Sequence, residues 1–236
     1  MKTLFITATG TGTGKTYITA ALGWALKAKG KFVRVLKPVI SGFDGETAED
    51  SDTYVLLRSL GPRPGQEPTA EAVEACSPWR FREPLSPDMA ARREGREIDF
   101  DALVQFCRDA QEDGKEGGKD GPEDVLLCEG IGGAMVPLDD THTVLDWINE
   151  WDAPALVVAG SYLGTLSHTL TTVAAMRERD VRVSGVVVSE SEESPVPVEE
   201  TVATIARFLK GIKIAAVARN AEPDEVLEAV SEMTGL

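Results

Sequence analysis

The stretch ATGTGTGKT, residues 8–16, ends in a lysine followed by a threonine, Lys15 and Thr16. In phosphate-binding loops, a lysine at this place contacts the terminal phosphates of a nucleotide, and the hydroxyl after it contacts Mg²⁺. The common consensus, G-x-x-x-x-G-K-[ST], puts its first glycine where this chain has Thr9. The sequence therefore predicts phosphate chemistry through a variant of that loop.

The loop has the local context that phosphate binding needs. An apolar run, TLFIT, precedes it, and an amphipathic segment follows it. Alternate glycines let a ligand approach the backbone closely, and the N-terminus of the following helix attracts anions. We therefore expect a nucleotide to contact Gly10, Gly12, Thr13, Gly14, Lys15, Thr16 and Tyr17.

A carboxylate directly follows another apolar run in VLLCEGIGGAMVPL, where Glu129 precedes a cluster of glycines. Ligands of open α/β sheets bind outside the carboxyl ends of the strands, so Glu129 and the phosphate loop should lie together. Asp52, in EDSDTY, is a further carboxylate. Because Mg²⁺ prefers oxygen ligands, the predicted metal ligands are Thr16, Asp52 and Glu129.

Lys37 lies at the end of a third apolar run and precedes a proline in LKPVISG. Pro38 cannot extend a strand ladder, so the chain must turn there. We expect Lys37 to lie with Lys15 at a solvated carboxyl edge, where two lysines could stabilise the charge on a transferring phosphoryl group. Ser41 offers a hydroxyl in the same segment.

These residues require a scaffold of alternating strands and helices. Six apolar runs predict strands, and four segments with a spacing near 3.6 predict helices. The alternation implies right-handed crossovers and a mainly parallel sheet with helices on both faces. We expect a single doubly wound, P-loop NTPase-like α/β domain over residues 1–236. The strands are expected at 3–7, 32–36, 124–128, 154–159, 183–188 and 213–218, and the helices at 15–30, 100–110, 165–180 and 198–211.

Composition limits the partners and the location. A net charge of -15 argues against nucleic acid and anionic membranes as partners. Three cysteines without metal-binding spacing indicate a reducing compartment, and the N-terminal apolar run is too short for a signal peptide. We therefore expect a cytoplasmic protein. The charged or acidic segments 111–124 and 189–200 are predicted to be solvated loops.

Several separated motifs together resemble the dethiobiotin synthase family over nearly the whole chain. In order, they are FITATGTGTGKT, KPVISG, SD, EPLSPDMAARREGREID, LLCEGIGGAMVPL, DWI and VVAGSYLGTLSHTLTT. The phosphate loop of that family is one residue longer than the common consensus, so Ala8 stands at the place of its usual first glycine. The resemblance implies an enzyme that uses ATP and Mg²⁺ to close a ureido ring in biotin synthesis.

The resemblance also implies a reaction sequence. CO₂ adds to one amine of 7,8-diaminononanoate, ATP phosphorylates the carbamate to a carbamic-phosphoric anhydride, and the second amine expels phosphate. By similarity, Thr11, Lys15, Lys37 and Ser41 would surround the carbamate. Since every step passes through an anion beside a polyphosphate, positioning and charge stabilisation would carry the catalysis without a covalent nucleophile.

A third implication is a homodimer in which each site uses both subunits. In SYLGTLSHTL a helix should begin after Gly164, and its first N–H groups, from Thr165 to Ser167, could bind the substrate carboxylate. We interpret His168 as a packing or surface residue. The predicted substrate-binding residues are Ser41, Gly132, Gly133, Leu163, Gly164, Thr165 and Ser167.

Three positions depart from the family pattern. Gly12 stands where members commonly carry an acid, Ser189 stands where an asparagine usually reads adenine, and VARN, residues 217–220, lacks the usual proline. A serine hydroxyl cannot reproduce the donor and acceptor pair of an amide. We therefore predict that Ser189 contacts the base weakly and that the preference among nucleotides is relaxed.

Two other classes of protein fit these motifs less well. A partner-regulated switch ATPase of the partitioning or septum-placing kind shares such a sheet, but it carries a signature lysine at the position of Gly10. The segment KPVISG also argues against that class. An amidotransferase-type synthetase, such as cobyrinic acid diamide synthase, needs a glutaminase domain, for which we expect no room in 236 residues.

Overall fold

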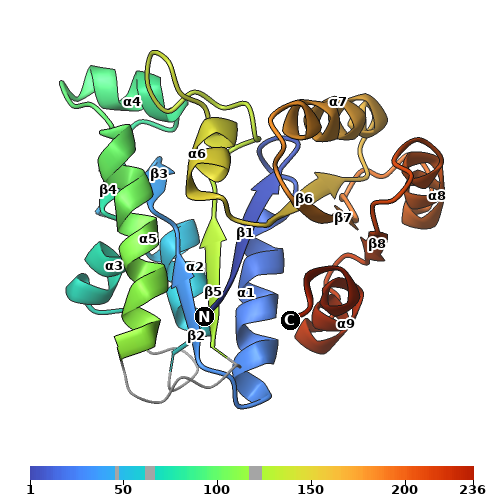
Figure 1. The fold of residues 1–236 in the computed structure, drawn as a ribbon, viewed down its shortest axis with the longest axis horizontal. Coiled ribbons are helices and arrows are strands. Elements are labelled where there is room, and N and C mark those ends of the chain that lie inside the picture. The colour runs from blue at the N-terminus through green and yellow to red at the C-terminus, as the bar shows by residue number, and fades with distance from the viewer. Residues whose placement is uncertain (46–47, 62–66, 117–123) are drawn as a thin grey trace.

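The computed structural model describes residues 1–45, 48–61, 67–116 and 124–236. Its centre is a six-stranded sheet in the order β2-β5-β1-β6-β7-β8, and every neighbouring pair is parallel. Helices cover both faces (Figure 1), so the predicted α/β fold is confirmed. Each strand matches its predicted run within one residue at either end: β1 (Lys2–Ala8), β2 (Val33–Leu36), β5 (Val125–Glu129), β6 (Ala155–Gly160), β7 (Val183–Ser189) and β8 (Ile214–Val217).

The four predicted helices follow strands as expected, and further helices that were not predicted lie between β2 and β5, between β5 and β6, and after β8. A second sheet pairs β3 (Val39–Ser41) with β4 (Trp79–Phe81) in parallel. The helices are α1 (Lys15–Ala28), η1 (Ala48–Asp50, a 3-10 helix), α2 (Asp52–Ser59), α3 (Ala70–Cys76), α4 (Pro87–Arg93), α5 (Phe100–Glu116), α6 (Val144–Trp151), α7 (Thr165–Glu178), α8 (Val198–Phe208) and α9 (Pro223–Thr234).

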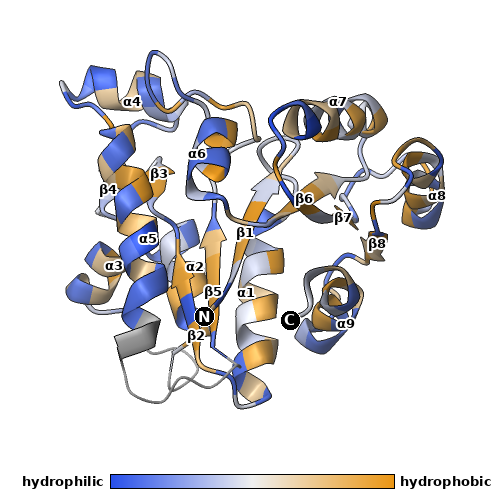
Figure 2. Cartoon of the chain, viewed as in Figure 1, coloured by the Kyte–Doolittle hydropathy of each residue, from blue (hydrophilic) through white to orange (hydrophobic). Residues whose placement is uncertain are grey.

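Successive side chains of the central strand β1 enter opposite cores. Leu4 packs in the same core as Leu22 of α1, whereas Phe5 packs in the other core with Trp147 of α6. The rings of Phe5 and Trp147 meet edge to face, with centroids 4.8 Å apart. Figure 2 shows apolar residues along the strands and mixed bands on the helices. This double burial fixes the carboxyl ends of the strands, where the predicted site residues lie.

Two loop predictions are wrong in part. Helix α5 continues to Glu116, so the first residues of the segment 111–124 are helical, while 117–123 lie outside the described residues. The segment 189–200 is also shorter than expected, because Ser189 ends β7 and α8 begins at Val198. Beyond the predicted end of α5, Gln111 Oε1 accepts a hydrogen bond from Trp151 Nε1 of α6 at 3.1 Å, which ties the extended helix to its neighbour.

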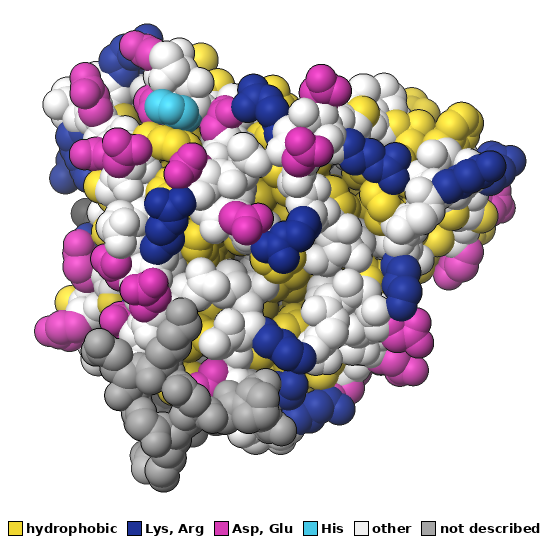
Figure 3. Space-filling model, in the orientation of Figure 1, with side chains coloured by type: hydrophobic (Ala, Val, Ile, Leu, Met, Phe, Trp, Pro, Cys, Tyr) yellow, Lys and Arg dark blue, Asp and Glu magenta, His cyan; other side chains and the backbone are white. Residues whose placement is uncertain are grey.

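The surface carries charges of both signs. On the face in Figure 3, basic and acidic side chains are interspersed. Within the described part of the chain, no helix combines the length and the apolar character that crossing a bilayer requires.

Candidate active site

The phosphate loop connects β1 to α1 and ends at a glycine that no other residue could replace without strain. Gly14 caps α1 with a φ of 92°, in the left-handed region. A Cβ atom at Gly14 would also lie 2.8 Å from Ser189 Oγ. Ser189, at the end of β7, therefore packs directly against the loop. Backbone strain and this contact together explain why glycine precedes Lys15.

A second glycine lets the segment after β5 approach the loop. A Cβ atom at Gly133 would lie 3.2 Å from the backbone nitrogen of Gly10. The backbone amide of Ala134 also donates to the carbonyl of Ala8, at 2.9 Å. Gly133 is therefore a packing residue of the loop, and it supports the site without lining the cavity described below.

Lys15 starts α1 and lies almost completely buried beside the loop. Its Nζ atom is 3.5 Å from the carbonyl oxygen of Gly10. Burial, and then the positive charge of Lys37, lower the pKa of Lys15 to about 8. An anion at the loop would favour the charged form of this amine, because an opposite charge raises the pKa of a lysine.

Lys37 lies deeper than the sequence predicts. Its side chain is 1% exposed, and its Nζ atom lies 2.6 Å from Glu129 Oε1 and 3.0 Å from Asp52 Oδ2. It also donates to the carbonyl of Gly130 at 2.9 Å. The predicted solvated position of Lys37 is wrong, because Asp52 of α2 and the end of α3, where the Cys76 carbonyl accepts from the Lys37 amide, enclose it.

The charges in this cluster stabilise one another. Burial alone would lower the pKa of Lys37, but the carboxylates of Glu129 and Asp52 outweigh it and raise the pKa above its ordinary value. Burial would likewise raise the pKa of Asp52, but Lys37 lowers it. Both groups are therefore charged near neutral pH, as the chemistry of an anionic intermediate requires.

The same cluster offers oxygen atoms to a metal ion. Thr16 Oγ1 donates to Glu129 Oε1 at 3.0 Å, and its hydroxyl also interacts with Asp52. Glu129 Oε2 is buried and has no hydrogen-bond partner among the described residues. No group of three or more His, Cys, Asp or Glu side chains in that part of the chain forms a metal site. Two carboxylates and a hydroxyl nevertheless fit Mg²⁺, which completes its shell with water and phosphate oxygens.

A cavity of about 900 Å³ joins the phosphate loop to this cluster. Its walls come from the loop, the start of α1, β3, the segment before α4 and the glycine cluster after β5. The predicted residues that line it are Thr11, Gly12, Gly14, Lys15, Thr16, Tyr17, Lys37, Ser41, Asp52 and Gly132. The structure therefore brings together residues that are far apart in the sequence, at one edge of the sheet.

The other predicted substrate-binding residues lie elsewhere in this single chain. Leu163 is 88% exposed, and Gly164 caps α7 with a φ of 100°. The prediction of an open N–H group at Thr165 is wrong, because that group donates to the carbonyl of Tyr162 at 3.1 Å. Its hydroxyl also donates, to the carbonyl of Gly160 at 2.6 Å. Among the residues that the structure describes, neither Leu163 nor the start of α7, including Ser167, lines the 900 Å³ cavity.

His168 lies on the surface of α7, as predicted. Its ring is exposed, and Nδ1 lies 2.8 Å from the hydroxyl of Tyr162. This contact joins α7 to the turn that precedes it. His168 therefore has a structural partner and needs no catalytic role.

A smaller cavity of about 390 Å³ lies on the other side of the loop. It contains two further predicted nucleotide contacts, Thr13 and Ser189, whereas Gly10 lines neither cavity. It also contains residues that sequence reasoning missed, from the ends of β7 and β8. The cavity is lined by Gly12, Thr13, Gly14, Tyr17, Ser189, Glu190, Ser191, Glu192, Arg219 and Asn220.

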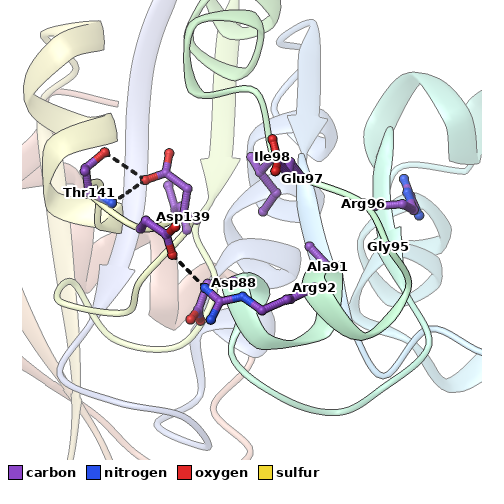
Figure 4. A pocket seen from close by; sticks show the side chains of 11 residues that line it. Asp88, Ala91, Arg92, Gly95, Arg96, Glu97, Ile98, Asp139 and Thr141 are labelled. Atoms are coloured by element: carbon purple, nitrogen blue, oxygen red, sulfur yellow. Dashed lines mark hydrogen bonds and ion pairs between the residues drawn. The ribbon is translucent and has the colours of Figure 1, made fainter.

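A cavity of about 710 Å³ between α4 and the segment 138–141 lies apart from the phosphate loop (Figure 4). Its polar groups bind one another: Arg92 pairs with Asp140 at 2.6 Å, and Thr141 donates twice to Asp139. These groups are satisfied within the protein. We therefore place the chemistry in the 900 Å³ cavity.

Comparisons with known proteins agree with this geometry. The family model described as AAA domain (AAA_26) matches residues 2–232. An ATP-dependent dethiobiotin synthetase BioD from Acidiphilium cryptum is 46% identical over 209 residues, which cover 89% of each chain. Another, from Methylobacterium nodulans, is 42% identical over 234 residues, which cover 98% of this chain and 99% of the relative.

Solved structures show the same fold at low sequence identity. The MinC:MinD cell division protein complex of Aquifex aeolicus matches with a TM-score of 0.56 at 16% identity, covering 100% of this chain and 95% of the other. Apo McdA from Cyanthece matches with a TM-score of 0.57 at 14% identity, covering 99% of each. These structures share only the fold with this chain, whereas the family model and the dethiobiotin synthetases also share its sequence. The chain belongs to the AAA domain family and, within it, to the ATP-dependent dethiobiotin synthetases.

Proposed function

We propose that this ATP-dependent ligase of biotin synthesis converts 7,8-diaminononanoate and CO₂ to dethiobiotin. One observation carries the proposal most directly. A single cavity of about 900 Å³ has the phosphate loop on one side and Lys37, Ser41 and Asp52 on the other. A nucleotide held by its phosphates and a diamine beside Lys37 would therefore meet within one enclosed volume.

The residues of the cavity suit a reaction in which negative charge moves between oxygens. Lys15 and Thr16 would contact the terminal phosphates of ATP at the start of α1, where free helix N–H groups also attract anions. Lys37 would hold the carbamate formed from CO₂ and one amine, since its charge is fixed by Glu129 and Asp52. Thr11 and Ser41 line the same cavity and would orient that carbamate through their hydroxyls.

The later steps would use the same groups. Transfer of the terminal phosphoryl group to the carbamate gives a carbamic-phosphoric anhydride and ADP. The second amine then attacks the carbonyl carbon, the bond to the phosphate oxygen breaks, and the ureido ring closes. Lys15 and Lys37 would stabilise the charge that develops on the transferred and departing phosphate oxygens.

We propose that Thr16, Asp52 and Glu129 hold Mg²⁺. The unpartnered buried oxygen of Glu129 supports this assignment, since an anionic oxygen without a hydrogen bond is costly unless a ligand engages it. When bound, the ion would neutralise phosphate charge and orient the terminal phosphoryl group.

The remaining proposals concern assembly and location. We propose a homodimer in which the segment from Leu163 to Ser167, distant from the cavity within its own chain, contacts the diamine bound by a second copy. The exposure of Leu163 supports this arrangement. We further propose one domain over residues 1–236 and a cytoplasmic location, which the three free, buried cysteines support.

The experiment that tests this function is product analysis. The protein is incubated with Mg-ATP, bicarbonate and 7,8-diaminononanoate, and the ureido product is detected by mass spectrometry. Matched incubations each omit one component. We expect product only in the complete mixture. If ATP is hydrolysed at the same rate in every mixture that contains it, and no ureido product forms, the result would instead favour a switch ATPase, a class that has the same fold as this chain.

A further inference from the structure

The 390 Å³ cavity adjoins the 900 Å³ cavity across the phosphate loop. Gly12, Gly14 and Tyr17 line both this cavity and the 900 Å³ cavity. A ligand whose phosphates lie on the loop can therefore extend over it into the smaller space. Ligand sites commonly occupy roughly 300 to 1,000 Å³, so a nucleoside fits a cavity of about 390 Å³.

The side chain expected to read the base contributes little here. Ser189 ends β7, and its Oγ atom lies against Gly14, 2.8 Å from the place of a Cβ atom. Its hydroxyl therefore lies close under the loop. A serine also lacks the paired donor and acceptor with which an amide contacts a base edge.

An amide is nevertheless present in the same cavity, on Asn220 in the turn after β8. Its side chain is exposed and makes no hydrogen bond to another of the residues that the structure describes. The neighbouring polar groups are engaged: the Arg219 guanidinium pairs with Glu192 at 3.2 Å, and the Arg219 amide donates to Glu190 at 2.9 Å. Asn220 thus offers a donor and an acceptor to a ligand.

The turn that carries Asn220 is held from both sides. The hydroxyl of Tyr17, on α1, donates to the carbonyl of Ala221. The amide of Ala221 donates to the carbonyl of Ala218 at 3.2 Å, which closes the turn. Because Tyr17 belongs to the helix that follows the phosphate loop, the backbone of this turn is held relative to the loop, while the exposed side chain of Asn220 stays free to turn toward a ligand.

We propose that the side-chain amide of Asn220 contacts the Watson–Crick edge of the nucleotide base. The proposal rests on the nucleotide site of the proposed function and adds a residue to it. An amide can exchange its oxygen and nitrogen by rotating half a turn, so it can pair with adenine, cytosine or guanine. Asn220 therefore strengthens nucleotide binding while it discriminates weakly among bases.

The competing explanation for an asparagine at this position is conformational. Asn220 has a φ of 60°, and asparagine adopts the left-handed region more readily than most residues. Glycine adopts it at least as readily. Asn220→Gly therefore removes the amide and keeps the turn, which separates a binding role from a conformational one.

The test compares ATP with inorganic tripolyphosphate as ligands of the full chain, in the presence of Mg²⁺, by titration calorimetry. We expect Asn220→Gly to weaken ATP binding by about tenfold, ~1.4 kcal/mol, and to leave tripolyphosphate binding unchanged. The matched control is Asp180→Gly, the same substitution at another left-handed turn, with a φ of 54°. The control should bind both ligands like the unmodified protein.

Each contrary outcome has a distinct meaning. Unchanged ATP affinity in Asn220→Gly would overturn the proposal, and so would an equal loss for ATP and tripolyphosphate, which would indicate a role in the turn alone. If the unmodified protein bound ATP no more tightly than tripolyphosphate, no base contact would exist, but the proposed function would stand. Failure to bind either ligand would overturn both the base contact and the proposed function.

Discussion

Lys37 Nζ lies 2.6 Å from Glu129 Oε1, and both side chains are completely enclosed by the protein. The pair joins the turn after β2 to the carboxyl end of β5, two strands that lie side by side. Breaking a buried ion pair leaves an uncompensated charge, so Lys37, which is proposed to hold substrate, also supports the fold. This relationship changes what substitutions at the site should do.

Lys37→Ala should abolish turnover and also destabilise the protein. The sequence alone predicts a catalytic loss with little effect on stability, but the buried carboxylate of Glu129 would lose its partner. We expect a loss of about 3 to 5 kcal/mol in the free energy of unfolding, measured by urea denaturation. The control, Lys29→Ala, removes an exposed pair with Asp224 at 3.9 Å and should change stability by less than about 1 kcal/mol. Equal stabilities for the two variants would contradict the buried pair.

Lys15→Ala should behave differently, because burial lowers the pKa of Lys15 to about 8 and therefore disfavours its charged form. Removing it should lower the rate of product formation by roughly 10² to 10³, since a charge-stabilising donor is lost. Its stability should equal or exceed that of the unmodified protein. Steady-state rates at saturating substrates, with urea denaturation alongside, measure both effects. Near-normal turnover would remove Lys15 from the mechanism.

The change of the unfolding free energy at acid pH should reflect Asp146, whose side chain belongs to the capping box at the start of α6. Burial would raise the pKa of Asp146, but its hydrogen bonds from Thr143 and its pair with Arg179 lower the pKa below the ordinary value. Its contribution is therefore complete above the ordinary pKa of about 4 and is lost as the pH falls through the lower folded-state pKa. The unfolding free energies of the protein and of Asp146→Asn should differ at pH 7 and converge below about pH 4. A difference that stays constant with pH would refute this assignment.

Nucleotide preference should be weak. Ser189 packs against the loop, and the amide of Asn220 suits several bases, whereas the loop is proposed to contact only phosphates. We predict that CTP and GTP support turnover within roughly tenfold of ATP, a difference of about 1.4 kcal/mol. Initial rates at matched subsaturating concentrations provide the comparison. A preference for ATP beyond about a hundredfold would show that other groups select the base.

Gly164→Val should impair binding of the diamine more than binding of ATP. Gly164 has a φ of 100°, which a β-branched residue rarely adopts, and the start of α7 is proposed to contact substrate in a second subunit. We expect the KM for the diamine to rise by about tenfold while the KM for ATP stays within about twofold. Gly164→Asn, which tolerates a positive φ better, serves as the control for strain. A parallel rise in both KM values would argue against the shared site.

The sheet and the proximity of the main site residues could be predicted from the sequence for clear physical reasons. Continuous apolar runs mark strands buried on both faces, and the carboxyl ends of parallel strands share one edge. Lys15, Lys37 and Glu129 follow three such strands, so their proximity was predictable. Sequence separation was no obstacle: Thr16 and Glu129 are 113 residues apart and still form a hydrogen bond, because the topology of the sheet determines the contact.

Other features left no periodic signal in the sequence. Strands β3 and β4 have only three residues each, which is too short for an alternation to be recognised. The depth of Lys37 depends on how α2 and the end of α3 fold over it, which a proline turn does not reveal. Asn220 lies in the VARN segment that departs from the family pattern, but its place beside Tyr17 depends on how α9 packs against α1.

The most direct measurement of the central claim is the coupling of phosphate release to ring closure. Purified protein receives Mg-ATP and isotopically labelled bicarbonate, with and without 7,8-diaminononanoate, and phosphate and labelled ureido product are quantified together. The account predicts one phosphate for each labelled ring and almost no phosphate without the diamine. Phosphate release that proceeds equally without the diamine, or a product without the label, would contradict it.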